Sequence, residues 1–252
     1  MLDNYICIAG KNQCAIEIAK FLLKKRYKKN LLILPNKSDT GKDGWQPSLR
    51  KFARNKRLQI VNEKKLEKIK NLFLFSIEYE KILKVRNFKS KNLFNIHFSL
   101  LPKFRGCHTN YLQVKFGEKK SGVTLHKIDA GIDTGGIVDQ LRFIIKINDT
   151  AKQNYMRLMK YSVKIFIKNF TKIYNEEYKL KKQNLSKSTY FKRKYVNYQK
   201  EKFIDFIKPS LKVHNKIRAL IFPPFQLPIV NKRKIYKSIF YNKKMIFNKY
   251  RR

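Results

Sequence analysis

Short apolar runs alternate with longer amphipathic segments along the first part of the chain. The runs at 5–9, 31–34, 58–61 and 72–77 have the length of buried strands, and apolar residues recur at helical spacing after the first of them. The charged segment 63–70 separates two runs and is expected to be a crossover helix. Strand and helix in alternation predict an α/β fold with a doubly wound, mostly parallel sheet that is covered by helices on both faces.

The pattern continues over the middle of the chain. Apolar runs at 93–98, 122–128 and 137–141 predict three further strands, and the last two flank a glycine-rich turn at 129–136. Segment 150–174 carries its apolar side chains at helical spacing, which predicts a long helix packed on the sheet. Its methionines and aromatic residues are therefore expected in the core rather than around a cofactor.

After residue 178 the apolar pattern loosens, and lysine, tyrosine and asparagine dominate. Two adjacent prolines, Pro223 and Pro224, end any helix before them, and the runs at 227–230 and 234–239 predict two strands. We expect a main domain at residues 1–185 and a small basic extension at residues 186–252.

The charge of the chain is strongly positive. Its 252 residues include 59 Lys and Arg against 17 Asp and Glu, a formal net charge of +42, and residues 151–252 carry +24 of it. Such a field attracts phosphate in nucleic acid, on an anionic membrane surface or in a small phosphorylated ligand. However, 46 of the basic residues are lysine, as an AT-rich coding sequence would produce, so part of the charge is attributed to compositional drift.

The cysteines and the N-terminus indicate the compartment. Cys7, Cys14 and Cys107 are odd in number and have no metal-ligand spacing, so neither a disulfide framework nor a zinc site is expected. No apolar run approaches the ~18 residues of a membrane span, and the N-terminus does not read as a signal peptide. A cytoplasmic protein is expected.

Two polar residues interrupt the apolar run at 93–98. Asn95 and His97 are two positions apart, so both side chains point from the same face of the predicted strand. They come near its carboxyl end, where open parallel sheets bind their ligands. Taken alone, such a pair is also explained by hydrogen bonds to the following loop.

The residues that follow make the pair part of a longer motif. Asn95-x-His97 continues as SLLPKFRG at 99–106, GVT at 122–124 and DAGIDTG at 129–135. This pattern resembles the formyltransferases that use N10-formyltetrahydrofolate, including the interval of 36 residues between His97 and Asp133. The resemblance covers roughly the first three quarters of the chain.

One departure points to a branch of that family. Phe98 stands where most members have proline, and together with His108-Thr109-Asn110 it is most similar to the formyltransferases of nucleotide-linked amino sugars, of the dTDP-4-amino-4,6-dideoxyglucose type. The resemblance implies a Rossmann-like formyltransferase fold, N10-formyltetrahydrofolate as formyl donor and no metal. It further implies an acceptor such as a dTDP-linked 4-amino-4,6-dideoxyhexose, used in lipopolysaccharide O-antigen synthesis.

The chemistry of formyl transfer explains the motif residues. A tetrahedral oxyanion must form while the attacking amine loses a proton. The resemblance implies Asn95, His97 and Asp133 as catalytic residues: an amide that binds the oxyanion, an imidazole that accepts the proton or stabilises the oxyanion, and a carboxylate that orients the imidazole. The first turn, at 10–14, lacks the G-x-G-x-x-G fingerprint, which disfavours a dinucleotide dehydrogenase.

The resemblance also implies ligand contacts on both sides of these residues. For the folate, it implies the loop after the fourth strand and the aspartate turn: Ser76, Ile77, Tyr79, Ile82, Ile128, Asp129 and Gly131. For the acceptor, candidates that could bind a diphosphate, stack on a base or donate hydrogen bonds are Trp45, Gln46, Lys103, Arg105, His108, Thr109, Asn110, Arg218 and Phe222. His126 and His214 are assigned no catalytic role.

Three alternatives stay open. Methionyl-tRNA formyltransferase would suit the basic tail, but its C-terminal barrel is larger than the 67 residues after residue 185. Glycinamide ribonucleotide formyltransferases are typically shorter and lack such a tail. A basic protein that binds nucleic acid or a membrane surface without catalysis is the third. The extension is expected to contribute to a homodimer and to substrate binding.

Overall fold

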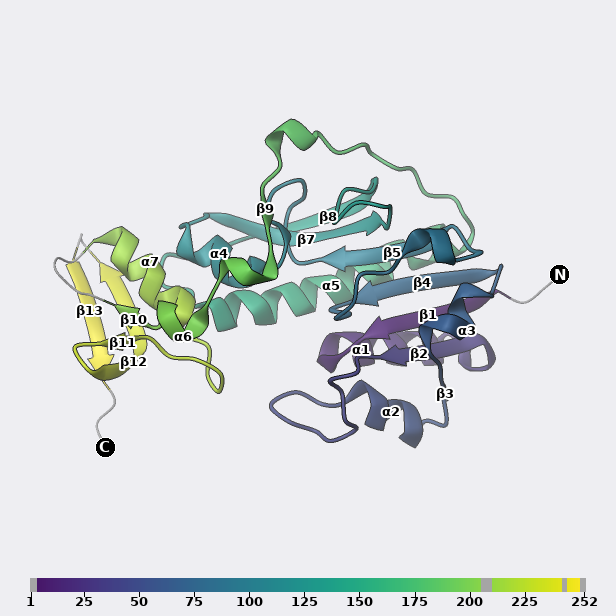
Figure 1. The fold of residues 1–252 in the computed structure, drawn as a ribbon, viewed down its shortest axis with the longest axis horizontal. Coiled ribbons are helices and arrows are strands. Elements are labelled where there is room, and N and C mark those ends of the chain that lie inside the picture. Colours follow the sequence, from purple (N-terminus) through teal and green to yellow (C-terminus); the bar gives the residue numbers. More distant parts are fainter. Residues whose placement is uncertain (1–3, 205–209, 242–243, 250–252) are drawn as a thin grey trace. The chain divides into compact units, whose positions relative to one another are not determined.

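The computed structural model describes residues 4–204, 210–241 and 244–249 (Figure 1). The chain forms two compact units, each assembled from three segments. The first unit contains residues 1–97, 123–141 and 159–187, and the second contains residues 98–122, 142–158 and 188–252. The domain boundary expected near residue 185 lies close to the change of unit between residues 187 and 188. Segments 98–122 and 142–158, which were expected in the main domain, belong to the second unit.

A seven-stranded sheet forms the framework, in the order β3-β2-β1-β4-β5-β7-β8. Its strands are β1 (Tyr5–Gly10), β2 (Leu31–Pro35), β3 (Gln59–Ile60), β4 (Leu72–Ile77), β5 (Asn92–His97), β7 (Lys120–Lys127) and β8 (Ile137–Ile144). The strands from β3 to β5 pair in parallel, and β5 pairs antiparallel with β7. The expected α/β fold with a mostly parallel sheet is confirmed.

Helices and 3-10 turns connect these strands or follow the last of them. They are α1 (Asn12–Lys24), η1 (Lys28–Asn30), α2 (Leu49–Asn55), α3 (Glu63–Glu67), η2 (Val85–Asn87), α5 (Ala151–Tyr174) and η3 (Leu185–Lys187). The crossover helix and the long helix predicted from the sequence are thus confirmed as α3 and α5. Asn62 begins α3 by accepting a hydrogen bond from the backbone N–H of Lys65, which satisfies one of the unpaired donors of the first turn.

Both faces of β1, β2 and β4 are buried, as their near-continuous apolar runs predicted, whereas the short strand β3 at the edge is partly exposed. Leu72 and Leu74 of β4 join a cluster on one face that includes Leu66 of α3. The alternate residue Phe75 packs on the other face against Phe166 of α5, with ring centroids 4.8 Å apart in an edge-to-face arrangement. Phe166 and Phe170 of α5 therefore belong to the core, as expected, whereas Met156 is 49% exposed and departs from the expectation because it lies on the outer face of the helix.

One glycine is required where β1 meets β4. Gly10 has φ +151°, and a Cβ there would lie 1.8 Å from the carbonyl oxygen of Ile77. Only glycine allows this approach of the two strand ends.

The second unit is built around a smaller sheet, in the order β10-β11-β12-β13. Its elements are β6 (Arg105–Gly106), α4 (Thr109–Lys115), β9 (Tyr190–Phe191), η4 (Arg193–Tyr195), α6 (Tyr198–Glu201), β10 (Phe203–Ile204), α7 (Leu211–Leu220), β11 (Ile229–Val230), β12 (Arg233–Tyr241) and β13 (Lys244–Lys249). The two strands expected after the prolines are confirmed as β11 and β12.

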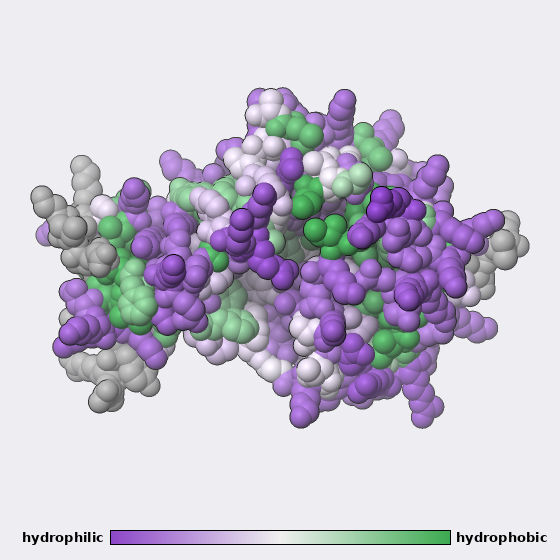
Figure 2. Space-filling model, viewed as in Figure 1, coloured by the Kyte–Doolittle hydropathy of each residue, from purple (hydrophilic) through white to green (hydrophobic). Residues whose placement is uncertain are grey.

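The surface reflects the composition. Hydrophilic side chains cover most of the face seen in Figure 2, with smaller apolar areas between them. Among the described helices, none combines the length and the apolar character that a bilayer crossing requires.

Candidate active site

The fold brings together the three residues predicted to be catalytic. His97 ends β5, and Asp133 lies in the turn between β7 and β8, where Nδ1 of the imidazole is 3.5 Å from Oδ2 of the carboxylate. Their side chains are only 8% and 12% exposed. A carboxylate beside Nδ1 favours the tautomer with the proton on Nδ1 and the lone pair on Nε2.

Asn95 lies on the same strand, two residues before His97. Its Nδ2 is 3.3 Å from Oδ1 of Asp133, so one carboxylate faces both the amide and the imidazole. The strand places these two side chains on one face, as the sequence predicted, and the turn supplies the carboxylate from a distant segment.

A fourth residue, which sequence reasoning missed, completes the cluster. His126 is directly opposite Asn95 in the β5–β7 register, and its Nε2 lies 3.2 Å from Nδ2 of Asn95. Its Nδ1 lies 2.8 Å from the carbonyl oxygen of Lys127, which can only accept, so Nδ1 carries the proton and Nε2 accepts from Asn95. The imidazole is 2% exposed and its Nε2 is also 3.6 Å from Oδ1 of Asp133.

Residues of the turn that carries Asp133 bond one another and pack on β7. Asp129 accepts hydrogen bonds at Oδ1 from the hydroxyl of Thr134 at 2.7 Å and from the N–H of Gly131 at 3.2 Å. Gly135 lies against β7, where a Cβ would be 1.9 Å from the carbonyl oxygen of Lys127. Asp133 itself has φ +54°, in the left-handed region. The carboxylate is thus presented by a tightly defined backbone.

The residues predicted to contact folate lie in the first unit at two places. Ser76 and Ile77 end β4 with buried side chains, and Ile82 in the loop beyond is 71% exposed. The Tyr79 hydroxyl donates to Oε1 of Glu63 at 2.6 Å, and burial together with that carboxylate raises the pKa of the tyrosine. Because the side chain of Ile77 is fully buried, a contact between folate and this residue would use its backbone.

The second place is the aspartate turn. Ile128 is half-buried, and Asp129 and Gly131 are exposed. The backbone N–H of Ile128 donates to the carbonyl oxygen of Leu93 at 2.8 Å, which ties the beginning of the turn to β5. Asp129 and Gly131 also bond each other, as described above.

The residues predicted to bind the acceptor are divided between the two units. Trp45 and Gln46 belong to the first unit, where Oε1 of Gln46 accepts from the N–H of Gln13 at 3.2 Å. In the second unit, Lys103 is exposed and the Arg105 guanidinium lies 5.5 Å from the centroid of the Tyr190 ring. Arg105 is thus held by an aromatic face, in the manner of a cation–π contact.

The group that begins α4 lies within the second unit. His108 has its Nδ1 3.1 Å from the Tyr198 hydroxyl and its Nε2 2.8 Å from the carbonyl oxygen of Arg193. Thr109 is buried, and the carbonyl oxygen of Asn110 accepts from Asn154. These contacts order the start of the helix.

Arg218 and Phe222, two further candidates for the acceptor, are buried in the second unit. Arg218 is 3% exposed and donates to the carbonyl oxygens of Asp149 at 2.7 Å and Lys146 at 3.2 Å, and to Oδ1 of Asn215 at 2.8 Å. Burial lowers the pKa of its guanidinium to about 10. Phe222 is likewise buried, and its ring packs against Tyr155. Both residues have the contacts of structural anchors in the second unit.

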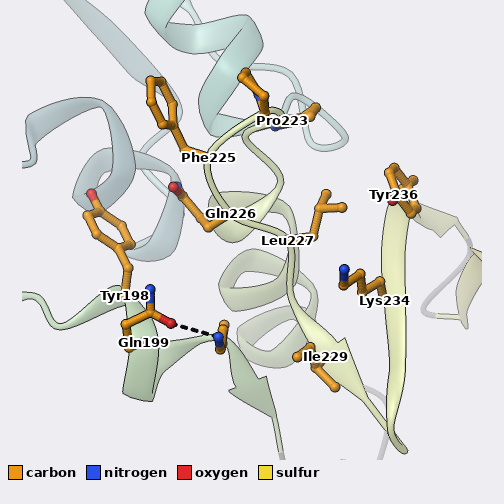
Figure 3. A pocket seen from close by; sticks show the side chains of 11 residues that line it. Tyr198, Gln199, Pro223, Phe225, Gln226, Leu227, Ile229, Lys234 and Tyr236 are labelled. Carbon is orange, nitrogen blue, oxygen red and sulfur yellow. Dashed lines mark hydrogen bonds between the residues drawn. The ribbon is translucent and has the colours of Figure 1, made fainter.

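A cavity of about 350 Å³ is present in the second unit (Figure 3). Its walls come from α6, the turn after α7 and the strands β11 and β12, through Tyr198, Gln199, Lys202, Pro223, Pro224, Phe225, Gln226, Leu227, Ile229, Lys234 and Tyr236. Lys202 donates to Oε1 of Gln199 at 2.7 Å. None of these described residues belongs to the set that was predicted to bind the acceptor.

The comparison with known proteins identifies the family. Residues 21–170 match the model of the formyl transferase family. The chain belongs to this family. Over 161 residues, 63% of its length, the chain is 37% identical to the bifunctional polymyxin resistance protein ArnA of Wigglesworthia glossinidia brevipalpis, and the alignment covers 24% of that protein. Methionyl-tRNA formyltransferases also match, several over about half of their length.

Two solved formyltransferase structures are similar over nearly the whole chain. The N-formyltransferase of Helicobacter canadensis, in complex with folinic acid and dTDP-3-aminofucose, is 43% identical with a TM-score of 0.91, covering 95% of this chain and 89% of that one. The sugar 3N-formyl transferase WlaRD, in the presence of dTDP and 5-N-formyl-THF, is 47% identical with a TM-score of 0.91, covering 95% and 87%.

Proposed function

We propose that this formyltransferase moves the formyl group of N10-formyltetrahydrofolate to the amine of a dTDP-linked amino sugar. The observation that carries the proposal is the buried cluster in which one carboxylate, Asp133, faces the imidazole of His97 at 3.5 Å and the amide of Asn95 at 3.3 Å. The ligands named for the two structures at 43% and 47% identity support the choice of donor and acceptor.

The proposed reaction breaks the bond between the formyl carbon and N10 and forms one between that carbon and the sugar nitrogen. Nε2 of His97 takes the proton that the attacking amine loses, and Asp133 stabilises the imidazolium that results. The proton then leaves with N10. The formyl oxygen becomes an oxyanion in the tetrahedral intermediate, and Asn95 donates to it. The hydrogen bond from Nδ2 of Asn95 to Asp133 is long, at 3.3 Å. We infer that the N–H in this bond turns from Asp133 to the oxyanion when the intermediate forms.

We propose the amine at C3 of the sugar. The sequence resemblance favoured an amine at C4, but the two structures at 43% and 47% identity are named for 3-amino substrates or 3N transfer. A named 4-N formyltransferase, from Francisella tularensis, is 19% identical and supports the fold alone.

A parallel assay tests donor, acceptor and amine position together. Purified enzyme would be given N10-formyltetrahydrofolate with dTDP-3-amino and dTDP-4-amino sugars, a UDP-4-amino sugar, initiator methionyl-tRNA and glycinamide ribonucleotide. We expect kcat/KM for the dTDP-3-amino sugar to be at least tenfold above that for every other acceptor. No turnover of any nucleotide-linked amino sugar would refute the proposal.

Methionyl-tRNA formylation is the second candidate. The matches to methionyl-tRNA formyltransferases and the net charge of +42 favour it. Nonspecific binding of tRNA follows from such a charge in any fold and weakens with salt. Formylation of the tRNA that persists at 0.2 M salt and exceeds sugar formylation would therefore favour this alternative.

We further propose that the product enters lipopolysaccharide O-antigen synthesis, that the protein works in the cytoplasm, and that it is a homodimer. Tyr236, Tyr241 and Ile246 on β12 and β13 are 40%, 67% and 54% exposed, and such apolar surface on a hairpin supports a subunit interface. Light scattering tests the last point, because a monomer mass would contradict it.

A further inference from the structure

The chain after α5 returns to the turn that carries Asp133. Lys181 and Ile137 exchange two backbone hydrogen bonds, both 2.8 Å long, so Lys181 pairs with the first residue of β8 in an isolated antiparallel bridge. Leu180 packs on the turn as well, since a Cβ at Gly136 would lie 3.1 Å from Cβ of that leucine. This bridge brings Gln183 to the backbone of the turn.

The side-chain amide of Gln183 bonds the turn on both sides of residue 134. Its Nε2 donates to the carbonyl oxygen of Asp133 at 3.0 Å and to that of Gly135 at 2.7 Å. Both partners can only accept hydrogen bonds, so the NH₂ end of the amide must face the turn and the side chain cannot be flipped.

This orientation of the amide leaves its oxygen without a hydrogen-bond partner among the residues that the structure describes, and that penalty indicates the role of the residue. Gln183 is 6% exposed, and its Oε1 is buried without a hydrogen-bond partner in the described part of the chain. A buried acceptor without a partner destabilises the folded state. An apolar residue would avoid that penalty, so the contribution of Gln183 lies in its two N–H donors.

The two N–H donors of Gln183 bond the turn next to a residue in an uncommon backbone conformation. Asp133 has φ +54°, a conformation that a residue other than glycine rarely adopts without support from its surroundings. The direction of its carboxylate, toward Nδ1 of His97 at 3.5 Å and Nδ2 of Asn95 at 3.3 Å, depends on that backbone. Fixing the carbonyls of residues 133 and 135 therefore fixes the carboxylate.

We propose that Gln183 is a positioning residue that holds Asp133 in its left-handed conformation and so aims the carboxylate at His97 and Asn95. The expected effect of Gln183 on kcat rests on the proposed formyl transfer. Its effect on the backbone of the turn can be measured whether or not the enzyme is active. Gln183 lies in the lysine-rich segment that follows α5 and touches no reacting group.

The test uses the full-length protein with two substitutions at Gln183 and one at its neighbour. Gln183→Met keeps the length of the side chain and removes both donors, and Gln183→Glu places a carboxylate against two carbonyl oxygens. The control is Asn184→Ala, because Asn184 is exposed and its described side-chain bonds go to Ser186. Circular dichroism first establishes that each variant is folded.

Hydrogen exchange and kinetics then give two independent readouts. In Gln183→Met we expect faster amide exchange confined to peptides that span 129–136, and kcat lower by on the order of 10- to 100-fold with KM for the amino sugar within about twofold. Gln183→Glu should lose at least as much, and Asn184→Ala should match the unaltered protein. In an Asp133→Asn background, Gln183→Met should lower kcat by less than about twofold, because the residue acts through that carboxylate.

The outcomes separate this inference from the proposed function. An unaltered enzyme that formylates no amino sugar refutes the proposed function, and the exchange experiment then decides the role of Gln183 alone. Unchanged exchange at 129–136 in Gln183→Met, or exchange that rises across the whole first unit, overturns the inference. So does an equal loss of kcat with and without the Asp133 carboxylate.

Discussion

Asn95 and His126 face each other across the antiparallel strands β5 and β7, with Nδ2 of the amide 3.2 Å from Nε2 of the imidazole. The other ring nitrogen of His126 is fixed by the carbonyl oxygen of Lys127 at 2.8 Å. The orientation of the Asn95 amide, and with it the position of the proposed oxyanion donor, is therefore set from the neighbouring strand.

Replacing His126 should impair catalysis although we assign it no contact with either substrate. His126→Ala removes the acceptor that orients Asn95, and we expect kcat to fall by on the order of tenfold or more. His126→Gln can still present an oxygen to Asn95 and should retain more activity. As a control, His214→Gln alters another buried histidine, whose ring bonds Ser238 and the carbonyl of Ile147, and should change thermal stability rather than kcat. Wild-type kcat in His126→Ala would contradict the role given to this pair.

The proposed catalytic pair should behave as one unit. His97→Ala should lower kcat/KM by about 10² to 10⁴, the range of general acid–base catalysis, and Asp133→Asn by less. The double variant should be little worse than His97→Ala, because the carboxylate acts through the imidazole. Asp43→Asn is the matched control, since Asp43 is an exposed partner of Lys51. Additive losses in steady-state kinetics would count against a shared role.

The periodicity of the sequence predicted the sheet because buried parallel strands leave near-continuous apolar runs, and it placed Asn95 and His97 on one face because strands alternate. The family resemblance then supplied Asp133, 36 residues beyond His97. These two sources together account for most of the cluster.

The remaining site residues depend on contacts that periodicity does not encode. His126 reaches Asn95 only because β7 pairs antiparallel with β5 in one register, and sequence alone does not reveal pairing direction. Gln183 is a polar residue in a polar segment, so nothing marks it until the bridge at Lys181 is seen. Arg218 has the residue type of a phosphate ligand, but burial against backbone carbonyls decides its surroundings.

Gly135 should tolerate no side chain. A Cβ at this position would lie 1.9 Å from the carbonyl oxygen of Lys127, so the turn or β7 must shift. We expect Gly135→Ala to lower the free energy of unfolding by about 1–3 kcal/mol and to lower kcat as Asp133 moves. Gly44→Ala is the matched control, because a Cβ at Gly44 meets no atom within 4 Å. Equal denaturation midpoints and equal kcat for the two variants would show that the turn can adapt.

The three cysteines should differ in reactivity. Burial raises the pKa of Cys7 and of Cys14 well above the usual range, and both thiols are enclosed in the first unit. Cys107 is partly exposed. The thiolate is the reactive form, so a chromogenic disulfide reagent at neutral pH should modify Cys107 first in the folded protein and all three after denaturation. Cys107→Ser should abolish the early phase, and an early phase that survives this change would contradict the burial of the other two.

Acid should destabilise the second unit through Asp149. Burial alone would raise the pKa of this carboxyl. The hydrogen bonds that Arg157 and the backbone N–H of Lys146 donate to it, together with the positive charges of Arg157 and Arg218, outweigh burial and hold the pKa below its usual value. A carboxyl whose pKa is lower in the folded state stabilises the protein above the unfolded pKa of about 3.9 and loses that contribution as the pH falls through the folded value. The stabilisation should therefore be complete at neutral pH and decline below about pH 4.

The variant Asp149→Asn measures this contribution. At pH 7 it should lower the free energy of unfolding by about 1–3 kcal/mol, between the values for exposed and buried pairs, because the Asp149 side chain is 7% exposed and that of Arg157 is 32% exposed. The difference from the unaltered protein should narrow as the pH falls toward 3, because the native carboxylate is then protonated. Asp43→Asn serves as the control, since that exposed carboxyl pairs with Lys51 in solvent and should have a smaller effect. Urea unfolding at several pH values gives both curves, and a constant difference between pH 7 and pH 3 would show that the titration of Asp149 does not control acid stability.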